Sequence, residues 1–496
     1  MSVALLIAEN QRDLLACFAA VEQLPYAMLL DSAAPDHPNS QFDMLVCQPL
    51  AKLEAYGHAC QVQFADQATP VLRSGQDPFL LLKQLQQQLL PAVTTEQLPL
   101  PFYGGALGYV SYDAGRVIEQ LPALALADIK LPDLAFGIYA WALVLDKQQQ
   151  QLWYVDCRAA NQAQASSYYQ QVEPLFASAL QQQPTTALPS FLLTSDWQSG
   201  ISQRQYQQKF QQIQQYLQSG DCYQINLAQR FSAGYQGSEW QAYLALRAAN
   251  AAPFSAFIRL EQGAVLSISP ERFLLLNQRQ VETKPIKGTK PRFADPVLDA
   301  QSAAALQQSA KDRAENVMIV DLLRNDLGKV CTPGTVRVPA LFQIESFPAV
   351  HHLVSTVTGE LASDYQAADL LRAAFPGGSI TGAPKVRAMQ IIEELEPCRR
   401  SVYCGAIGYL SQHGRMDSNI AIRTLVCQQG QIYCWAGGGI VADSKADSEY
   451  QETFDKVAKI LPVLSALSAA NHSNAAACAG SALTAEPALV SKAQAS

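Results

Sequence analysis

Short apolar runs separated by polar residues fill the first 190 residues of the chain. Residues 137–145 are apolar, Asp146 and Lys147 lead into four glutamines, and residues 152–155 are apolar again. This alternation predicts a β-hairpin with a polar tip. Residues 181–190 are rich in glutamine, proline and threonine and carry no apolar period, so we expect a linker and place a boundary there.

A helical pattern follows the boundary. Between Ser202 and Gly220, apolar residues recur at helical spacing: Tyr206, Phe210, Ile213 and Leu217. After residue 466 the chain is dominated by alanine and serine without a hydrophobic period. We therefore expect an N-terminal region over residues 1–190, a second region over residues 196–465, and a disordered tail over residues 466–496.

Composition narrows the classes of function. The chain has 496 residues, 49% of them apolar, so it can bury a large core of two to four domains. A net charge of −8 argues against nucleic acid as a partner. No apolar stretch approaches the roughly 20 residues of a membrane span, and Glu9 interrupts the first apolar run, which excludes a secretory signal. The 11 cysteines form no C-x-x-C pair, so we expect reduced thiols and a cytoplasmic protein.

Lys287 is the first candidate for chemistry, because it lies between Ile286 and Gly288 in a run typical of a buried strand. It is either a surface lysine at a strand end or a desolvated amine that can attack an electrophilic carbon. Glu271 lies at a strand break about 16 positions earlier, and a hairpin could bring the two together. The pair could serve as a general acid or base with an amine, or form a plain salt bridge.

Three glutamates suggest a metal site. Glu315 lies at the edge of a mostly apolar helical stretch over residues 314–326, and Glu449, Glu452 and Lys456 share one stripe of a C-terminal helix. Carboxylates from separate helices, without matching cysteine or histidine ligands, suit a hard ion such as Mg²⁺. Glu452 and Lys456 also fit an ordinary solvated helix pair.

Two glycine-rich segments could bind an anion through their backbone. Residues 375–385 lead into a helix over 386–395 and do not form a Walker A loop, and Gly437–Gly439 follow a strand over 432–436. A mobile turn is the alternative for both segments. His352 stands between strand-like residues 347–350 and 353–357, where it could act as a catalytic group or as a hydrogen-bonded structural histidine.

The order of these motifs resembles the chorismate-utilising enzymes over roughly residues 200–462. The resemblance rests on Ser269-Pro270-Glu271-Arg272-Phe273, Pro285-Ile286-Lys287-Gly288-Thr289, Asp321-Leu322-Leu323-Arg324-Asn325-Asp326, Gly378-Ser379-Ile380-Thr381-Gly382-Ala383-Pro384-Lys385, Tyr403-Cys404-Gly405-Ala406-Ile407-Gly408-Tyr409 and Gly437-Gly438-Gly439-Ile440-Val441-Ala442-Asp443-Ser444. At the position of Lys287 the anthranilate and isochorismate branches have alanine, whereas the aminodeoxychorismate branch has lysine. The resemblance implies an α+β fold of orthogonally packed antiparallel β-sheets with external helices.

The resemblance also implies roles for individual residues. Lys287 is the expected nucleophile, Glu271 a general acid or base, and His352 an assisting group near the leaving hydroxyl. The expected Mg²⁺ ligands are Glu315, Glu452 and Glu449. The residues that match substrate-binding positions of the family are Ser379, Thr381, Tyr403, Arg423, Gly437, Gly438, Gly439 and Lys456.

The implied reaction converts chorismate and ammonia to 4-amino-4-deoxychorismate, a step towards 4-aminobenzoate and folate. The chain has no recognisable glutaminase motif, so the resemblance implies a separate glutamine amidotransferase subunit. Alternatives are anthranilate synthase component I and a non-catalytic relic that binds tryptophan or a partner. The segments that resemble a tryptophan pocket contain Ser32, Asn39, Ser40, Gln41, Phe42, Pro253, Phe254 and Ser255; the neighbouring Asp31 departs from the glutamate of the regulated enzymes.

Overall fold

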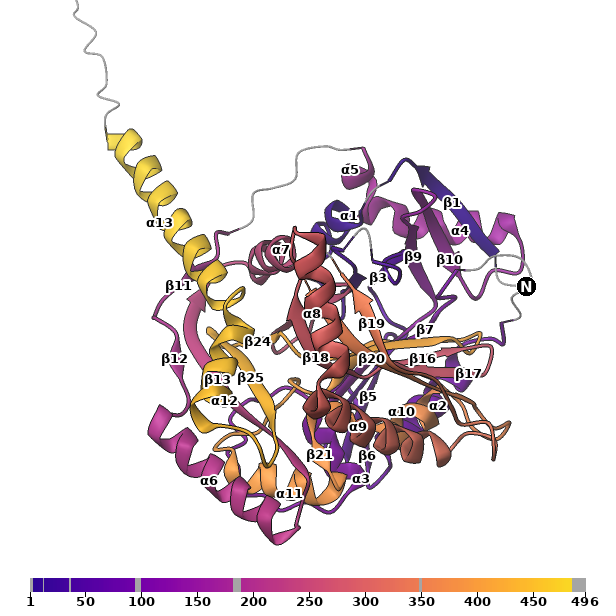
Figure 1. The fold of residues 1–496 in the computed structure, drawn as a ribbon. Coiled ribbons are helices and arrows are strands. Elements are labelled where there is room, and N and C mark those ends of the chain that lie inside the picture. The colour runs from indigo at the N-terminus through magenta and orange to yellow at the C-terminus, as the bar shows by residue number, and fades with distance from the viewer. Residues whose placement is uncertain are drawn as a thin grey trace, which may run out of the picture.

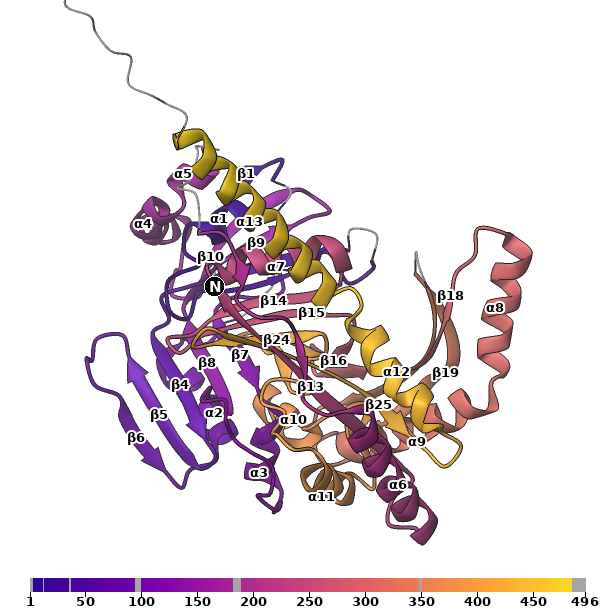
Figure 2. The same ribbon diagram turned by 90° about the vertical axis from the view of Figure 1, so that its left-hand side faces the viewer.

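The computed structural model describes residues 3–11, 13–34, 37–93, 100–181, 189–347 and 350–483. Two large antiparallel sheets, of 13 and 12 strands, form the interior, with helices around them (Figures 1 and 2). The expected α+β class, with antiparallel sheets and external helices, is confirmed. Within the described residues, no helix is long and apolar enough to cross a membrane.

The 13-stranded sheet carries one half of the site. Its order is β1 (Val3–Glu9), β10 (Gln151–Asp156), β9 (Trp141–Asp146), β3 (Phe42–Val46), β2 (Met28–Asp31), β14 (Phe254–Arg259), β15 (Ala264–Ser269), β24 (Thr424–Gln428), β25 (Gln431–Ile440), β13 (Gln224–Gln236) and β11 (Leu192–Leu193); β12 (Gln198–Ser199) and β21 (Gly382–Ala383) also pair with β13.

The 12-stranded sheet carries the other half. Its order is β18 (Ile286–Pro291), β20 (Val350–Glu360), β17 (Gln280–Thr283), β16 (Arg272–Asn277), β23 (Met416–Ile420), β22 (Ala406–Ser411), β7 (Gly105–Val110), β8 (Leu134–Tyr139), β4 (Ala51–Tyr56), β5 (Ala59–Phe64) and β6 (Val71–Ser74); β19 (Arg337–Ser346) pairs with β20. Figure 2 shows β18 and β19 at one end of the molecule and β5 and β6 at the other.

Helices cover these sheets. They are α1 (Leu15–Ala19), α2 (Pro78–Leu89), α3 (Gly115–Ile118), α4 (Gln162–Val172), α5 (Ala177–Leu180), α6 (Gln203–Ser219), α7 (Glu239–Asn250), α8 (Pro296–Gln308), α9 (Ala310–Gly328), α10 (Ala367–Ala374), α11 (Lys385–Leu395), α12 (Ala446–Val457) and α13 (Leu461–Leu483), with short 3₁₀ turns at Tyr112–Ala114, Glu173–Leu175 and Gly378–Ile380. For the site, α9 packs on β20, α11 on β13 and α12 on β25.

The predicted local elements are present. Strands β9 and β10 form the expected hairpin, with residues 147–150 as its tip. The predicted helix after the boundary is α6, where Ser202 is the N-cap, its side chain accepting from the backbone of Gln205, and Gly220 ends the helix with φ +79°. One detail differs, because residues 137–145 form two strands, β8 and β9, that belong to different sheets.

The predicted boundary does not divide the sheets. Strand β2 of the N-terminal region pairs with β14, and β7 pairs with β22, so residues from both sides of the boundary share both sheets and their cores. Residues 182–188 of the predicted linker lie outside the described residues.

The prediction of a disordered tail is wrong over residues 466–483, which belong to α13. Ser468 Oγ accepts from Leu193 N at 2.9 Å, and Asn471 Nδ2 donates to Phe191 O at 2.9 Å. These two hydrogen bonds tie the middle of α13 to the segment around β11. Residues 484–496 lie outside the described residues.

Candidate active site

Lys287 lies in β18, at the edge of the 12-stranded sheet rather than in a strand buried on both sides, and the residue is partly buried. Its Nζ donates to the carbonyl oxygen of Ser379, 3.3 Å away. The loss of water around the amine lowers the pKa of Lys287 below its ordinary value, although the nearby carboxylates of Glu315 and Glu271 oppose this. The partial burial of Lys287 favours the desolvated amine, and its role as the nucleophile stays a prediction.

Glu271 lies between β15 and β16 and is 8% exposed. Its Oε1 accepts from Ser379 Oγ at 3.1 Å. Burial raises the pKa of Glu271 to about 7, against the opposing charge of Lys287. The structure thus brings Glu271 and Lys287 to the two sides of Ser379, and among the described residues no ion pair joins them directly.

The three predicted metal ligands lie on two helices, Glu315 on α9 and both Glu449 and Glu452 on α12. A Cβ atom placed on Gly438 would lie 3.1 Å from Glu449 Oε2 and 3.2 Å from Glu452 Oε1, so the missing side chain lets both carboxylates approach β25. Burial raises the pKa of Glu449, and the charge of Glu452 adds to this. Burial likewise raises the pKa of Glu315, with a further contribution from Glu449. The carboxylates are therefore close enough to repel one another.

The chemistry of these three carboxylates suits a hard divalent cation. All of their donor atoms are oxygen, and a cation would neutralise the repulsion between their negative charges. It is not closed around a metal: within the described part of the chain, no three side chains of His, Cys, Asp or Glu stand close enough together to hold an ion. Glu452 instead pairs with Lys456 at 2.6 Å, and Glu449 accepts from Ser444 Oγ at 2.7 Å. The ordinary helix pair predicted as the alternative is thus present for Glu452.

His352 lies inside the single strand β20. The prediction that it separates two strand-like runs is therefore wrong. Its Nδ1 is 2.8 Å from Thr289 Oγ1, and its ring centroid is 5.6 Å from that of Phe347. Burial, with the charge of Arg423, lowers the pKa of His352 to about 4. The ring is therefore neutral near pH 7 and is held by Thr289, a residue of the Lys287 motif for which no role was predicted.

Arg423 and Tyr403 are two further predicted substrate-binding residues. The guanidinium of Arg423 forms no hydrogen bond or ion pair with any residue that the structure describes, and Arg423 adopts φ +50°, which few side chains tolerate. Tyr403 is buried and stacks on Trp435 with centroids 6.0 Å apart. An arginine without a protein partner is free to bind a carboxylate through two N–H groups.

The two glycine-rich segments meet in space through β13. Asn226 N donates to the carbonyl of Thr381 at 2.8 Å, and Asn226 is paired with Gly439 across the sheet. Lys456 Nζ donates to the carbonyl of Gly437 at 2.6 Å. The hydroxyl of buried Thr381 donates to Gly377 O at 3.0 Å, so it is used within the loop. Gly437–Gly439 belong to β25, whereas residues 375–385 contribute a 3₁₀ turn at Gly378–Ile380 and the short strand β21.

The segments expected to line a tryptophan pocket also come together. Asp31 is paired with Ser255 across β2 and β14, and the Ser32 and Ser40 hydroxyls are 2.5 Å apart. Asp31 forms an ion pair with Arg247 and accepts from Tyr243 OH at 2.6 Å. Tryptophan binding stays a prediction.

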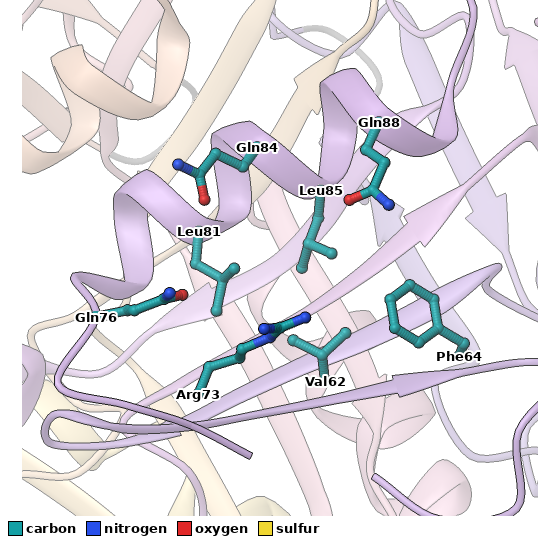
Figure 3. A pocket seen from close by; sticks show the side chains of 8 residues that line it. All are labelled: Val62, Phe64, Arg73, Gln76, Leu81, Gln84, Leu85 and Gln88. Atoms are coloured by element: carbon teal, nitrogen blue, oxygen red, sulfur yellow. The ribbon is translucent and has the colours of Figure 1, made fainter. Parts of the chain in front are cut away.

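A separate cavity of about 230 Å³ lies between α2 and the strands β5 and β6 (Figure 3). Its lining residues are Val62, Phe64, Arg73, Gln76, Leu81, Gln84, Leu85 and Gln88. None of them is a predicted site residue, and β5 and β6 lie at the opposite end of the 12-stranded sheet from β18. This cavity is therefore not the candidate active site.

Comparison with known proteins places the chain in a family. Residues 27–462 match the family model described as chorismate binding enzyme. The chain belongs to the chorismate binding enzymes. This confirms the family to which the sequence motifs pointed.

Individual relatives narrow the position within the family. The chain is 54% identical over 449 residues to aminodeoxychorismate synthase component 1 of Escherichia coli K12, covering 90% of this chain and 95% of that protein. It is 54% identical over 451 residues to the protein of the same name from Klebsiella aerogenes, with 90% and 95% coverage. The crystal structure of anthranilate synthase component I from Streptococcus pneumoniae has a TM-score of 0.73 at 30% identity, covering 86% of this chain and 93% of that one.

Proposed function

We propose that this protein aminates chorismate at C4 to give 4-amino-4-deoxychorismate. The observation that carries the proposal is the placement of Lys287, with a lowered pKa, opposite Glu271 across Ser379. The similarity to proteins named aminodeoxychorismate synthase component 1 supports it. We propose further that the product serves the formation of 4-aminobenzoate and folate.

Lys287 acts as the nucleophile in this proposal. Its neutral Nζ forms a bond to C2 of chorismate, the ring double bonds shift, and the bond from C4 to its hydroxyl breaks. Ammonia then bonds to C4, the double bonds shift back, and the bond between C2 and Nζ breaks to return the amine. Two easier displacements thus replace a single difficult one. The lowered pKa of Lys287 increases the share of the neutral amine, which is the form that the first step requires.

Glu271 moves the protons. With a pKa of about 7, part of its population is protonated near neutral pH, so it can give a proton to the departing hydroxyl, which leaves as water. The resulting carboxylate can take a proton from the nitrogen that ammonia adds at C4. Ser379 Oγ holds the carboxylate in place at 3.1 Å. His352 is neutral, and in the tautomer whose Nδ1 donates to Thr289 Oγ1 its Nε2 can accept a hydrogen bond near the leaving group.

Substrate anions have three sets of partners. The guanidinium of Arg423 has no partner among the described residues and can bind a substrate carboxylate. The ammonium of Lys456 lies beside the glycine segment, where it donates to the carbonyl of Gly437. Glu315, Glu449 and Glu452 would hold Mg²⁺, which when bound supplies positive charge for a substrate carboxylate. Without a cation, these crowded carboxylates would repel an anionic substrate.

Ammonia comes, in this proposal, from a glutamine amidotransferase subunit that binds this chain. The word component in the names of the similar proteins supports a partner. Free ammonium should replace the partner in the test tube, because the residues proposed for the chemistry all belong to this chain.

The test is product identification. Purified protein is incubated with chorismate, Mg²⁺ and ammonium at pH 8, and the products are separated by chromatography and identified by their masses. We expect 4-amino-4-deoxychorismate, which retains the enolpyruvyl group. Anthranilate with released pyruvate would overturn the proposal in favour of an anthranilate synthase. No turnover, even with an amidotransferase and glutamine, would indicate a non-catalytic relative.

A further inference from the structure

Gln224 is fully buried, yet its side-chain amide is unpaired. Neither Nε2 nor Oε1 has a hydrogen-bond partner among the residues that the structure describes. Two positions along β13, on the same face of the strand, Asn226 Oδ1 is also buried without a partner. Buried polar groups in folded proteins are almost always hydrogen-bonded, so a pair of unpaired amides requires an explanation.

Another buried glutamine of the same strand shows the usual arrangement. Gln229 Nε2 donates to Thr453 Oγ1 at 2.5 Å, and its Oε1 accepts from Ser199 Oγ at 2.5 Å. Strand β13 can therefore satisfy a buried amide within the protein where the side chain has a structural role. Gln224 lacks such partners although its backbone is fixed by pairing with Ala383 of β21.

The amide of Gln224 lies between the two glycine-rich segments of the candidate site. A Cβ atom on Gly439 would lie 2.8 Å from Gln224 Nε2 and 3.0 Å from its Cδ, so the amide occupies the space that a side chain at position 439 would need. On the other side, Gln224 pairs with Ala383, and Asn226 N donates to Thr381 O. Glycine at position 439 is thus explained by the approach of this amide.

We propose that Gln224 is a further substrate-binding residue, whose Nε2 donates a hydrogen bond to a carboxylate oxygen of chorismate between Gly439 and Thr381. The inference rests on the proposed function and extends its substrate site from the backbone of the glycine segments to a side chain of β13. Asn226 Oδ1, a buried acceptor without a partner among the described residues, lies on the same face of β13. Bound substrate then relieves a buried amide that the free enzyme leaves unpaired.

The test uses Gln224→Met, which keeps the shape of the side chain and removes its polar atoms, and Gln224→Glu, which places a negative charge against the carboxylate. Gln428→Met is the control, because Gln428 is buried in β24 and its Oε1 accepts from Lys130 N at 2.9 Å within the protein. For each purified variant, KM and kcat are measured with chorismate and ammonium, and melting temperature is measured with and without chorismate and Mg²⁺.

For Gln224→Met we expect KM for chorismate to rise by about tenfold or more, the effect of losing a hydrogen bond to a charged group, with a smaller change in kcat. Its melting temperature without substrate should be unchanged or higher, because an unpaired buried amide is removed, whereas the stabilisation by chorismate should shrink. Gln224→Glu should raise KM further. Gln428→Met should melt at a lower temperature and keep the KM of the wild type.

Two results would overturn the inference. A KM within twofold of the wild type in Gln224→Met would show that the amide does not bind substrate. A lower melting temperature together with unchanged KM would show that a structural water satisfies Gln224. Failure of the proposed function is a different outcome, since the wild type itself would then neither bind nor aminate chorismate.

Discussion

Replacing Glu271 with glutamine should remove catalysis and, above neutral pH, stabilise the fold. The pKa of Glu271 is about 7 in the folded protein, against 4.5 for an ordinary glutamate, because burial disfavours its charge. Above pH 7 the wild type must bury an ionised carboxylate. A pKa difference of about 2.5 corresponds to about 3 kcal/mol, which is the destabilisation that Glu271→Gln should relieve.

The sign and the pH window follow from the direction of the shift. Below about pH 4.5 Glu271 is protonated in both the folded and the unfolded chain, so its burial does not lower the free energy of unfolding. Between pH 4.5 and 7 the folded state binds more protons, and the wild type loses stability as pH rises. The stability advantage of Glu271→Gln should therefore grow from near zero at pH 4.5 to about 3 kcal/mol at pH 8.

The assay is urea denaturation of both proteins at pH 4.5, 6 and 8, without substrate or metal, where the fold permits. Glu360→Gln is the matched control, because Glu360 is exposed at the end of β20. If Glu271→Gln and the wild type lose stability in parallel as pH rises, or if the variant is less stable at pH 8, the burial argument for the acid–base role of Glu271 is refuted. Product formation, measured in parallel, should fall by about 10²-fold or more.

Three further predictions concern other parts of the chain. Lys385→Met leaves the buried Asp326 with only the half-exposed Lys329 as an ion-pair partner, and it should lower the free energy of unfolding by about 3 kcal/mol in urea denaturation. Lys329→Met leaves the partly buried Lys385 partner in place and should cost under about 1 kcal/mol, so equal losses in the two variants would refute this prediction. Gly437→Ala places a Cβ 2.5 Å from a backbone oxygen of β13 and should lower the free energy of unfolding by about 1–3 kcal/mol in the same assay. Gly328→Ala is the control, because no heavy atom lies within 4 Å of the added Cβ, and it should be neutral or slightly stabilising. Equal stabilities of the two variants would contradict the close approach of β25 to β13. If the predicted tryptophan pocket is occupied, protein denatured in acid should release about one equivalent of tryptophan to mass spectrometry, and none would remove that prediction.

The local elements were predictable because their signals are local. Ser202, the spacing of Tyr206 to Leu217, and Gly220 together specify α6 at both ends. The sheet to which each strand belongs was not predictable. The apolar run 137–145 is buried along its whole length, so its sequence does not mark the point where β8 of one sheet ends and β9 of the other begins. The tail was misjudged for a related reason. Alanine favours helix without a hydrophobic period, and the side chains of Ser468 and Asn471 supply the anchors.

The site was predictable at residues whose type is unusual for their place in the chain. A lysine in an apolar run and a glutamate at a strand break drew attention to Lys287 and Glu271. Ser379 was expected to bind substrate, but its position between Lys287 and Glu271 was not predictable, because it accepts from Lys287 through a backbone carbonyl that every residue carries. Thr289 stands two residues after Lys287 and fixes His352 through pairing of β18 with β20, a long-range contact. Gln224 was hidden because the chain is rich in surface glutamines.

The amine of Lys287 is the proposed nucleophile, and intact-mass analysis shows whether it forms a bond to chorismate. Wild-type protein and Lys287→Ala are each mixed with chorismate and Mg²⁺ without ammonia, quenched, weighed and digested for peptide mapping. We predict that the wild type gains the mass of one chorismate less one water, mapped to Lys287, and that ammonium discharges it. An equal adduct on Lys287→Ala, or turnover to 4-amino-4-deoxychorismate by that variant at the wild-type rate, would contradict the account.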